Sequence, residues 1–150
     1  MSDRTILGID PGKMTGWALL DDTGKLVDMG QVSYPGLYEW LDSLHYIDIY
    51  VIENFRIRPG VNFSWQEMDT IKAIGAAEFR AYQKGAHVVK QEPANYTVGA
   101  KWAGIQIPKD HSISHQAVAY AHAVFYSVKV LGRPVPAFAG RGGLDDAAKG

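Results

Sequence analysis

The sequence predicts a mixed α/β fold in which five strands form one sheet flanked by helices. Three strand-like segments follow one another near the N-terminus, separated by turn sequences: "TILGI" at 5–9, "GWALLDD" at 16–22 and "KLVDMGQVS" at 25–33. Helix and strand patterns then alternate as far as about Leu131. Three leading antiparallel strands followed by such alternating units predict a sheet with parallel additions and helices packed on it.

The later elements follow from hydrophobic patterns and helix-end signals. The run "IDIYVIE" at 47–53 is almost continuously apolar, as in a central strand that is covered on both faces. Ser64 and Glu67 form a capping box, which predicts a helix that ends at Lys84-Gly85. The remaining expectations are a short helix at 38–44, a strand at 86–90, a loop with about one helical turn at 91–104, and a long helix from about His111 to Leu131.

Length and composition are those of one soluble globular domain. The chain has 150 residues, a formal net charge of −1 and no cysteine, which excludes disulfides, thiolate zinc sites and cysteine nucleophiles. A nucleic-acid partner would have to meet a local basic patch. No targeting or membrane-length apolar segment is visible, so we expect a cytoplasmic protein without a membrane partner. We expect one domain over 1–131 and a Gly/Pro/Ala-rich segment over 132–150, which is either a tail or the start of a last acidic helix.

Two acidic residues end two of the predicted core strands. Because side chains alternate along a strand, Asp10 shares a face with Ile6, and Glu53 shares a face with Ile49. If these strands are parallel neighbours, both carboxylates face the crevice at the carboxyl ends of the strands, where α/β sheets bind ligands. Two carboxylates there repel each other unless a cation intervenes. Mg²⁺ suits such oxygen ligands, and Mn²⁺ is the alternative.

Each acid also has a simpler interpretation. Asp10 precedes Pro11-Gly12 and could be a turn residue that hydrogen-bonds the backbone. Glu53 could be a solvated residue at a strand end. Their occurrence together, at corresponding ends of two predicted core strands, favours the metal site over these alternatives.

Three segments resemble one enzyme family. "ILGIDPGKMTGWALLDD", "YVIENFRIRPG" and "QEPANYTVGAKWAG" are similar to sequences of the ribonuclease H-like endonucleases of the RuvC type, particularly the small Holliday-junction resolvases of phages. The resemblance covers roughly Thr5 to Leu131. It implies a ribonuclease H-like fold and a phage- or bacterium-encoded enzyme that hydrolyses phosphodiesters in branched DNA. Two divalent metals at Asp10 and Glu53 would clamp the scissile phosphate.

The remaining ligands of such a site are open between two alignments. The phage-type relatives carry the pattern His-x-x-Asp-Ala-x-x-His on the last helix. Aligned with "HQAVAYAH" at 115–122, this pattern makes His115 a catalytic candidate and places Val118 where the relatives have the aspartate. The other alignment takes "GGLDDAAKG" as the start of the last helix. It makes Asp145 and Asp146 metal ligands, with Asp146 also catalytic, but Lys149 stands where a further acid is expected.

Three histidines fall on one stripe of the predicted long helix. His111, His115 and His122 are four and seven residues apart, with Val118 between the last two. They are either packed or solvated helix residues, or ligands of the site. A zinc site made from all three is improbable, because this spacing over-extends one tetrahedron.

Basic and aromatic residues cluster near the two acids in the sequence. We expect phosphates to be contacted by the basic residues and bases to be stacked or wedged by the aromatic ones. The alternative is that they are ordinary surface residues. The residue set is Lys13, Phe55, Arg56, Arg58, Lys101 and Trp102. The expected partner is branched DNA, with a possible homodimer that matches the two-fold symmetry of a junction.

Two other functions remain open. Val118 and Lys149 are consistent with a catalytically weak or inactive ribonuclease H-like module that binds branched DNA. Actin-like ATPases and sugar kinases also begin with a sequence close to "GIDPGKMTG", where the loop cradles phosphate. Those enzymes need two such domains around the nucleotide, and this length supplies one.

Overall fold

The sheet of this protein has five strands and combines antiparallel with parallel pairing. The computed structural model describes residues 4–56, 59–60, 62 and 64–136. The strand order is β3-β2-β1-β4-β5. β1 (Ile6–Asp10), β2 (Met14–Leu20) and β3 (Leu26–Ser33) form an antiparallel meander, while β4 (Ile49–Glu53) and β5 (His87–Gln91) add in parallel to β1. The predicted fold class is confirmed.

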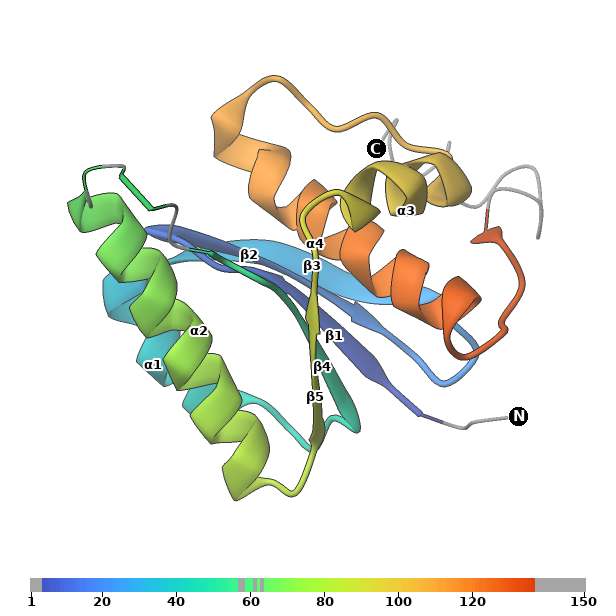
Figure 1. Ribbon diagram of the computed structural model, residues 1–150. Coiled ribbons are helices and arrows are strands. Elements are labelled where there is room, and N and C mark those ends of the chain that lie inside the picture. Colours follow the sequence, from blue (N-terminus) through green and yellow to red (C-terminus); the bar gives the residue numbers. More distant parts are fainter. Residues whose placement is uncertain (1–3, 57–58, 61, 63, 137–150) are drawn as a thin grey trace.

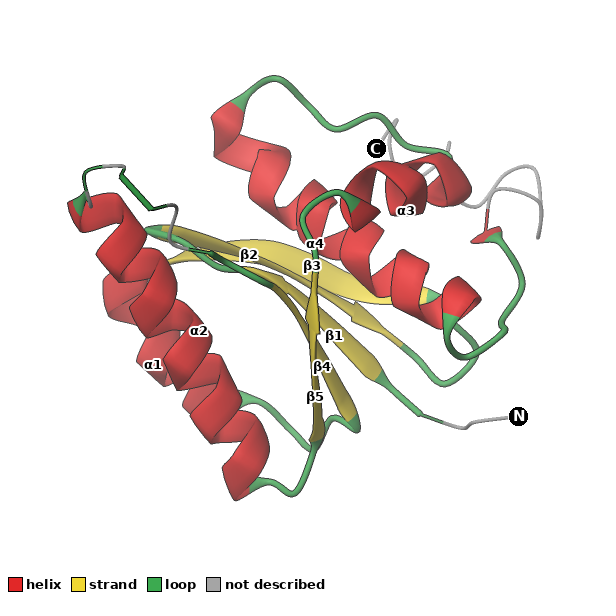
Figure 2. Ribbon diagram, viewed as in Figure 1, coloured by secondary structure: helices red, strands yellow, loops and turns green. Residues whose placement is uncertain are grey.

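Helices cover both faces of this sheet. α1 (Tyr34–Ser43) and α2 (Trp65–Gln83) lie side by side on one face, and α3 (Asn95–Ala103) and α4 (His111–Lys129) lie on the other (Figure 1, Figure 2). The capping box predicted for α2 is present, with Ser64 and Glu67 each accepting a hydrogen bond from the backbone N–H of the other. The parallel connections through α1 and α2 therefore place the carboxyl ends of β1, β4 and β5 at one edge of the sheet.

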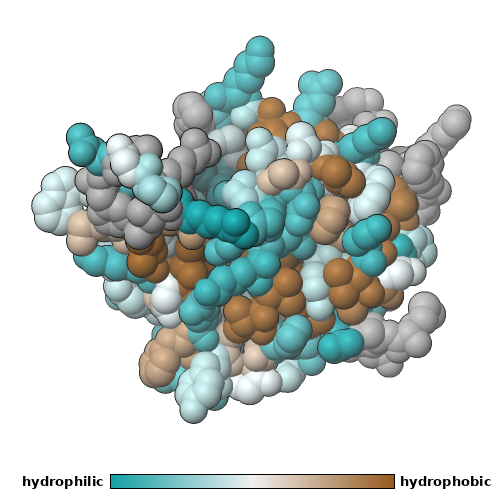
Figure 3. Space-filling view, viewed as in Figure 1, coloured by the Kyte–Doolittle hydropathy of each residue, from teal (hydrophilic) through white to brown (hydrophobic). Residues whose placement is uncertain are grey.

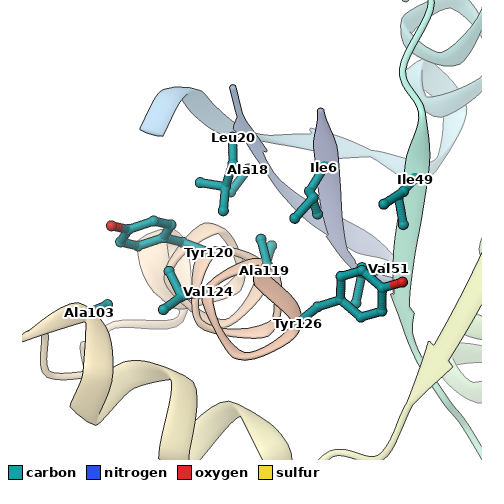
Figure 4. Packing of buried hydrophobic residues seen from close by; sticks show 11 residues of the cluster. Ile6, Ala18, Leu20, Ile49, Val51, Ala103, Ala119, Tyr120, Val124 and Tyr126 are labelled. Carbon is teal, nitrogen blue, oxygen red and sulfur yellow. The ribbon is translucent and has the colours of Figure 1, made fainter. Parts of the chain in front are cut away.

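Two hydrophobic clusters separate according to the alternation of side chains along the strands. On the α1/α2 side, Leu7 and Ile9 of β1 pack with Tyr50 and Ile52 of β4. On the α4 side the buried cluster, drawn in Figure 4, is Ile6, Ala18, Leu20, Ile49, Val51, Ala103, Ala119, Tyr120, Ala123, Val124 and Tyr126. Burying each large aliphatic side chain contributes roughly 1.5–3 kcal/mol, so both layers stabilise the central strands that carry the acids.

Close packing of α4 depends on small residues in its neighbours. A Cβ on Gly8 of β1 would clash with the carbonyl oxygen of Ala119, and one on Gly16 of β2 would clash with the backbone of His115. A Cβ on Gly99 of α3 would clash with the carbonyl oxygen of Ala121. These glycines let the backbone of α4 pack directly against the sheet and against α3. This close packing determines the positions of the α4 side chains relative to the strands.

Two helices differ from the sequence-based expectation. α1 begins at Tyr34 instead of residue 38, with Pro35 in its first turn, where a missing N–H costs no helical hydrogen bond. The segment predicted as a loop contains the nine-residue helix α3, which ends at Gly104 in the left-handed conformation. Gly99 lowers the helix propensity of that segment, but it is the residue that allows α3 to pack against α4.

The surface shown in Figure 3 intersperses hydrophobic with hydrophilic side chains. Large apolar side chains that are exposed include Trp65 at the start of α2 and Phe79 and Tyr82 near its end. Within the described part of the chain, no helix is both long and apolar enough to cross a membrane.

Candidate active site

Asp10 and Glu53 end adjacent parallel strands. Ile9 of β1 pairs with Ile52 of β4, so the next residue of each strand brings the two carboxylates to the same edge of the sheet. Both side chains lie on the sheet face that α4 covers, and they retain 14% and 21% of their exposed area. The structure therefore brings together the two acids that the sequence predicts to share the crevice.

Asp10 is paired with a histidine of α4. Its Oδ2 lies 2.9 Å from Nδ1 of His115. In the antiparallel register Asp10 is opposite Gly16, and the missing side chain of Gly16 leaves space for the backbone of His115. The sequence prediction that His115 belongs to the site is thus consistent with its position, which depends on a glycine in a neighbouring strand.

The turn after Asp10 is held by another residue. Thr15, which is fully buried, donates from Oγ1 to the carbonyl oxygen of Gly12 and accepts from the N–H of Gly12. The hydroxyl thus closes the Pro-Gly turn, while the carboxylate of Asp10 pairs with His115. This arrangement supports a site role for Asp10 over the role of a turn residue.

Glu53 has a buried histidine as its partner. Oε2 of Glu53 lies 2.7 Å from Nε2 of His122, a residue of α4 that is completely buried. Nδ1 of His122 lies 2.8 Å from Nε2 of Gln91, at the end of β5. Gln91 in turn is the register partner of Glu53. Two strand ends and one helix thus converge on this hydrogen-bonded group.

Electrostatics distinguish the Asp10–His115 pair from an exposed ion pair. Burial raises the pKa of the Asp10 carboxyl above its usual value, the hydrogen bond from His115 lowers it, and the nearby Glu53 carboxylate raises it. The hydrogen bond to Asp10 raises the pKa of His115, against the effect of its partial burial. The Glu53 carboxylate lies close enough to oppose the ionisation of Asp10, which a bound cation would relieve.

The raised pKa of His115 predicts how stability depends on pH. Its imidazolium stabilises the folded state fully below the unfolded pKa of about 6.5, and this contribution is lost as pH rises through the higher folded pKa. We expect the difference in unfolding free energy between wild type and His115→Asn to decrease as pH rises above about 6.5. Urea denaturation at a series of pH values, in EDTA, measures this difference in unfolding free energy. His45→Asn, at an exposed histidine, is the control, and a difference independent of pH would contradict the prediction.

A cleft opens beside this pair at the carboxyl edge of the sheet. It has a volume of about 650 Å³ and lies between the two helical layers. Its walls are Pro11, Gly12, Lys13, Met14, Gln31, Ser33, Gln66, Thr70 and His115. A smaller hollow of about 140 Å³ lies between α1 and α2 on the other side of the sheet. The larger cleft is the one in contact with the site, because His115 belongs to both.

The described residues contain no group of three or more histidine, aspartate or glutamate side chains arranged to hold a metal ion. Val118, which takes the position of an acid in one alignment, is half-buried on α4 between His115 and His122. Asp145 and Asp146, the ligands in the other alignment, lie outside the described residues, as does Lys149. No described residue supplies a third carboxylate beside Asp10 and Glu53.

The six residues expected to contact DNA occupy different positions. Lys13 is exposed and lines the cleft. Arg56 is exposed but pairs with Glu92 at 2.6 Å. The other placements are as follows: Phe55 is half-buried just after β4, Lys101 is exposed in the last turn of α3, Trp102 stacks on Phe125 of α4 with ring centroids 5.6 Å apart, and Arg58 lies outside the described residues.

Sequence reasoning missed the roles of His122 and Gln91 in this site. His122 lies seven residues after His115, which places both on one helix stripe. Gln91 ends a strand in the same way as Asp10 and Glu53. Extending the strand-end argument to every parallel strand would have found Gln91, whereas the pairing of each histidine with a particular acid depends on the position of α4.

Comparisons with known proteins identify the fold. No protein-family model and no curated protein matches the sequence. Among solved structures, the chain is similar to Thermus thermophilus RuvC, with 20% identity, a TM-score of 0.62, and coverage of 85% of this chain and 96% of that one. It is also similar to T. thermophilus RuvC in complex with a Holliday junction substrate, with 18% identity, the same TM-score and the same coverage. The chain therefore has a mixed α/β fold like that of RuvC.

Proposed function

We propose that this protein is a divalent-metal-dependent endonuclease that cleaves branched DNA. The observation that carries the proposal is the pair of carboxylates, Asp10 and Glu53, at adjacent strand ends, each hydrogen-bonded to a histidine of α4. The similar solved structure of T. thermophilus RuvC with a Holliday junction substrate supports branched DNA as the substrate class.

The donor atoms of the site fit Mg²⁺, with Mn²⁺ as an alternative. The two histidines take Oδ2 of Asp10 and Oε2 of Glu53, and leave the second oxygen of each carboxylate outside these hydrogen bonds. Mg²⁺ is commonly held by one or two carboxylates together with substrate phosphates and water. Such a site does not need a third acidic group from the protein. A bound Mg²⁺ would polarise the scissile phosphate and activate the attacking water.

His115 is placed to move a proton in this reaction. Its Nδ1 is paired with Asp10, the residue lines the cleft, and its side chain keeps 33% of its exposed area. The hydrogen bond to Asp10 raises the pKa of His115, which favours the protonated form of the ring. In the proposed reaction Nε2 donates this proton to the leaving oxygen, and Asp10 holds the ring in orientation.

The cleft would position one DNA strand beside the acids. Lys13 contacts a phosphate by charge, and Gln31, Ser33 and Thr70 provide polar side chains along the walls. Arg56 can exchange Glu92 for a phosphate at small cost, because an exposed ion pair of this kind contributes only about 0–1 kcal/mol. We propose a homodimer, which would present two such clefts to a two-fold symmetric junction.

A second candidate is a junction-binding module with weak or no catalysis. The observation that favours it is Val118, an apolar residue between the two histidines that contact the acids. An enzyme that needs a third acidic ligand from α4 would be inactive with valine there. The two candidates differ in cleavage but agree in binding.

The test of the proposal is cleavage of a labelled four-way junction and a matched linear duplex. With Mg²⁺ or Mn²⁺ we expect symmetrical nicks in the junction, none in the duplex, and no cleavage in EDTA. Junction binding without cleavage would support the binding module. Absence of binding to either DNA would overturn both candidates and favour a nucleotide-phosphate site.

Val118→Asp tests whether the site lacks an acidic ligand. The new carboxylate would lie on the stripe of α4 that carries His115 and His122, near both acids. We expect Mn²⁺ affinity, measured by calorimetry, to rise about tenfold, since one additional ligand needs to contribute only about 1.4 kcal/mol. Val118→Asn has the same shape without the charge and should not show this increase. Equal affinities for both variants would contradict the prediction.

A further inference from the structure

Gln91, His122 and Glu53 form a buried chain of hydrogen bonds at the carboxyl ends of β4 and β5. Gln91 is 5% exposed and His122 is fully buried. Nε2 of Gln91 lies 2.8 Å from Nδ1 of His122 and 3.1 Å from the carbonyl oxygen of the same residue. Nε2 of His122 lies 2.7 Å from Glu53. Both ring nitrogens are therefore occupied by contacts within the protein.

The carbonyl oxygen of His122 determines the orientation of the Gln91 amide. A carbonyl oxygen only accepts hydrogen bonds, so the amide NH₂ of Gln91 must face it, because the amide oxygen would be an acceptor facing an acceptor. The same NH₂ group faces Nδ1 of His122. Because NH₂ only donates, Nδ1 must be the acceptor and carries no proton. The ring proton then lies on Nε2 and is donated to Glu53.

We propose that Gln91 is a positioning residue, which holds His122 in the Nε2–H tautomer so that His122 orients the carboxylate of Glu53. The ring plane is held independently by Tyr96 of α3, which packs edge-on at 6.1 Å between ring centroids. His122 is excluded as a metal ligand, since neither nitrogen has a free lone pair. Its role is to direct the second oxygen of Glu53 toward the crevice.

The consequence for metal binding rests on the proposed function, whereas the tautomer does not. Carboxylates that bind metals are usually held by such outer hydrogen bonds, and loss of these partners typically reduces metal affinity or activity about 10–100-fold. Glu53 needs this support because it lies beside a second buried acid, Asp10, which interacts with it electrostatically. Asp10 obtains the equivalent support from His115.

The tautomer is measured by long-range ¹H–¹⁵N NMR on the full chain with ¹⁵N-labelled histidine. In the wild type we expect His122 to show an unprotonated Nδ1 and a protonated Nε2. A protonated Nδ1 would overturn the proposal without any variant. Gln91→Glu replaces the amide donor with a carboxylate acceptor, so Nδ1 of His122 should carry the proton that bonds it to this carboxylate. An Nδ1 that stays unprotonated in this variant would show that Gln91 does not control the tautomer.

The positioning role is measured by Mn²⁺ calorimetry on wild type, Gln91→Leu and the control Gln106→Leu, which changes an exposed glutamine. We expect about a tenfold or greater loss of affinity in Gln91→Leu alone, with folding of each variant checked by circular dichroism. Equal affinity in a folded Gln91→Leu would overturn the positioning role, and Gln91→Met, which also lacks the NH₂ group and adds no charge, is the substitute if Gln91→Leu does not fold. A wild type that binds no Mn²⁺ would count against the proposed function and the positioning role, while the NMR result would still decide the tautomer.

Discussion

Asp10→Asn should reduce the rate of junction cleavage about a thousandfold or more while junction binding is retained. Asparagine keeps the shape of the side chain but removes the charge that would hold a divalent cation at the end of β1. Metal-ion catalysis stabilises transition-state charge by several kcal/mol, and a loss of about 4 kcal/mol corresponds to a thousandfold in rate. Single-turnover cleavage and a binding titration, both with Mg²⁺, measure the two effects separately.

The matched control is Asp22→Asn, which changes an exposed aspartate in the turn after β2. We expect it to cleave at the rate of the wild type. Glu53→Gln should resemble Asp10→Asn, and the double variant should lose little more, because residues that act as one unit are not additive. Cleavage by Asp10→Asn at the wild-type rate would place the catalytic site elsewhere and overturn the proposed function.

Gly8→Ala should destabilise the fold by about 3 kcal/mol. The added methyl group would clash with the carbonyl oxygen of Ala119 and come within 3.0 Å of Cβ of Ala123. Both atoms belong to the packed face of α4, so the helix has to shift, and overpacking of this kind typically costs 1–3 kcal/mol or more. Chemical denaturation, followed by circular dichroism, gives the change in unfolding free energy.

Gly75→Ala is the matched control for this substitution. Gly75 lies on α2, and a Cβ there meets no atom within 4 Å. Alanine should therefore stabilise the protein by roughly 0.5–1 kcal/mol, because glycine is a poor helix former. If Gly8→Ala were as stable as the wild type, the close packing of α4 on β1 would be wrong, and with it the distances from His115 and His122 to the two acids.

Much of the fold could be predicted because it depends on short-range patterns. The almost continuous apolar run that became β4 and the capping box of α2 are visible within a few residues. α3 could not be predicted in the same way. Its N-cap residue, Ala94, makes no side-chain cap, and Gly99 weakens the helix locally. That helix exists because of its packing against α4, a contact that no local window contains.

For the site, the sequence by itself determined which strand ends carry acids. Alternation along β1 and β4 was enough to place Asp10 and Glu53 on one face, since this geometry repeats every two residues. Only the tertiary structure decided their partners. Glycines at positions 8 and 16 set the distance of α4 from the sheet, and this distance pairs His115 with Asp10 and His122 with Glu53. Those pairings join residues 105 and 69 positions apart, so they follow from helix packing and not from any local pattern.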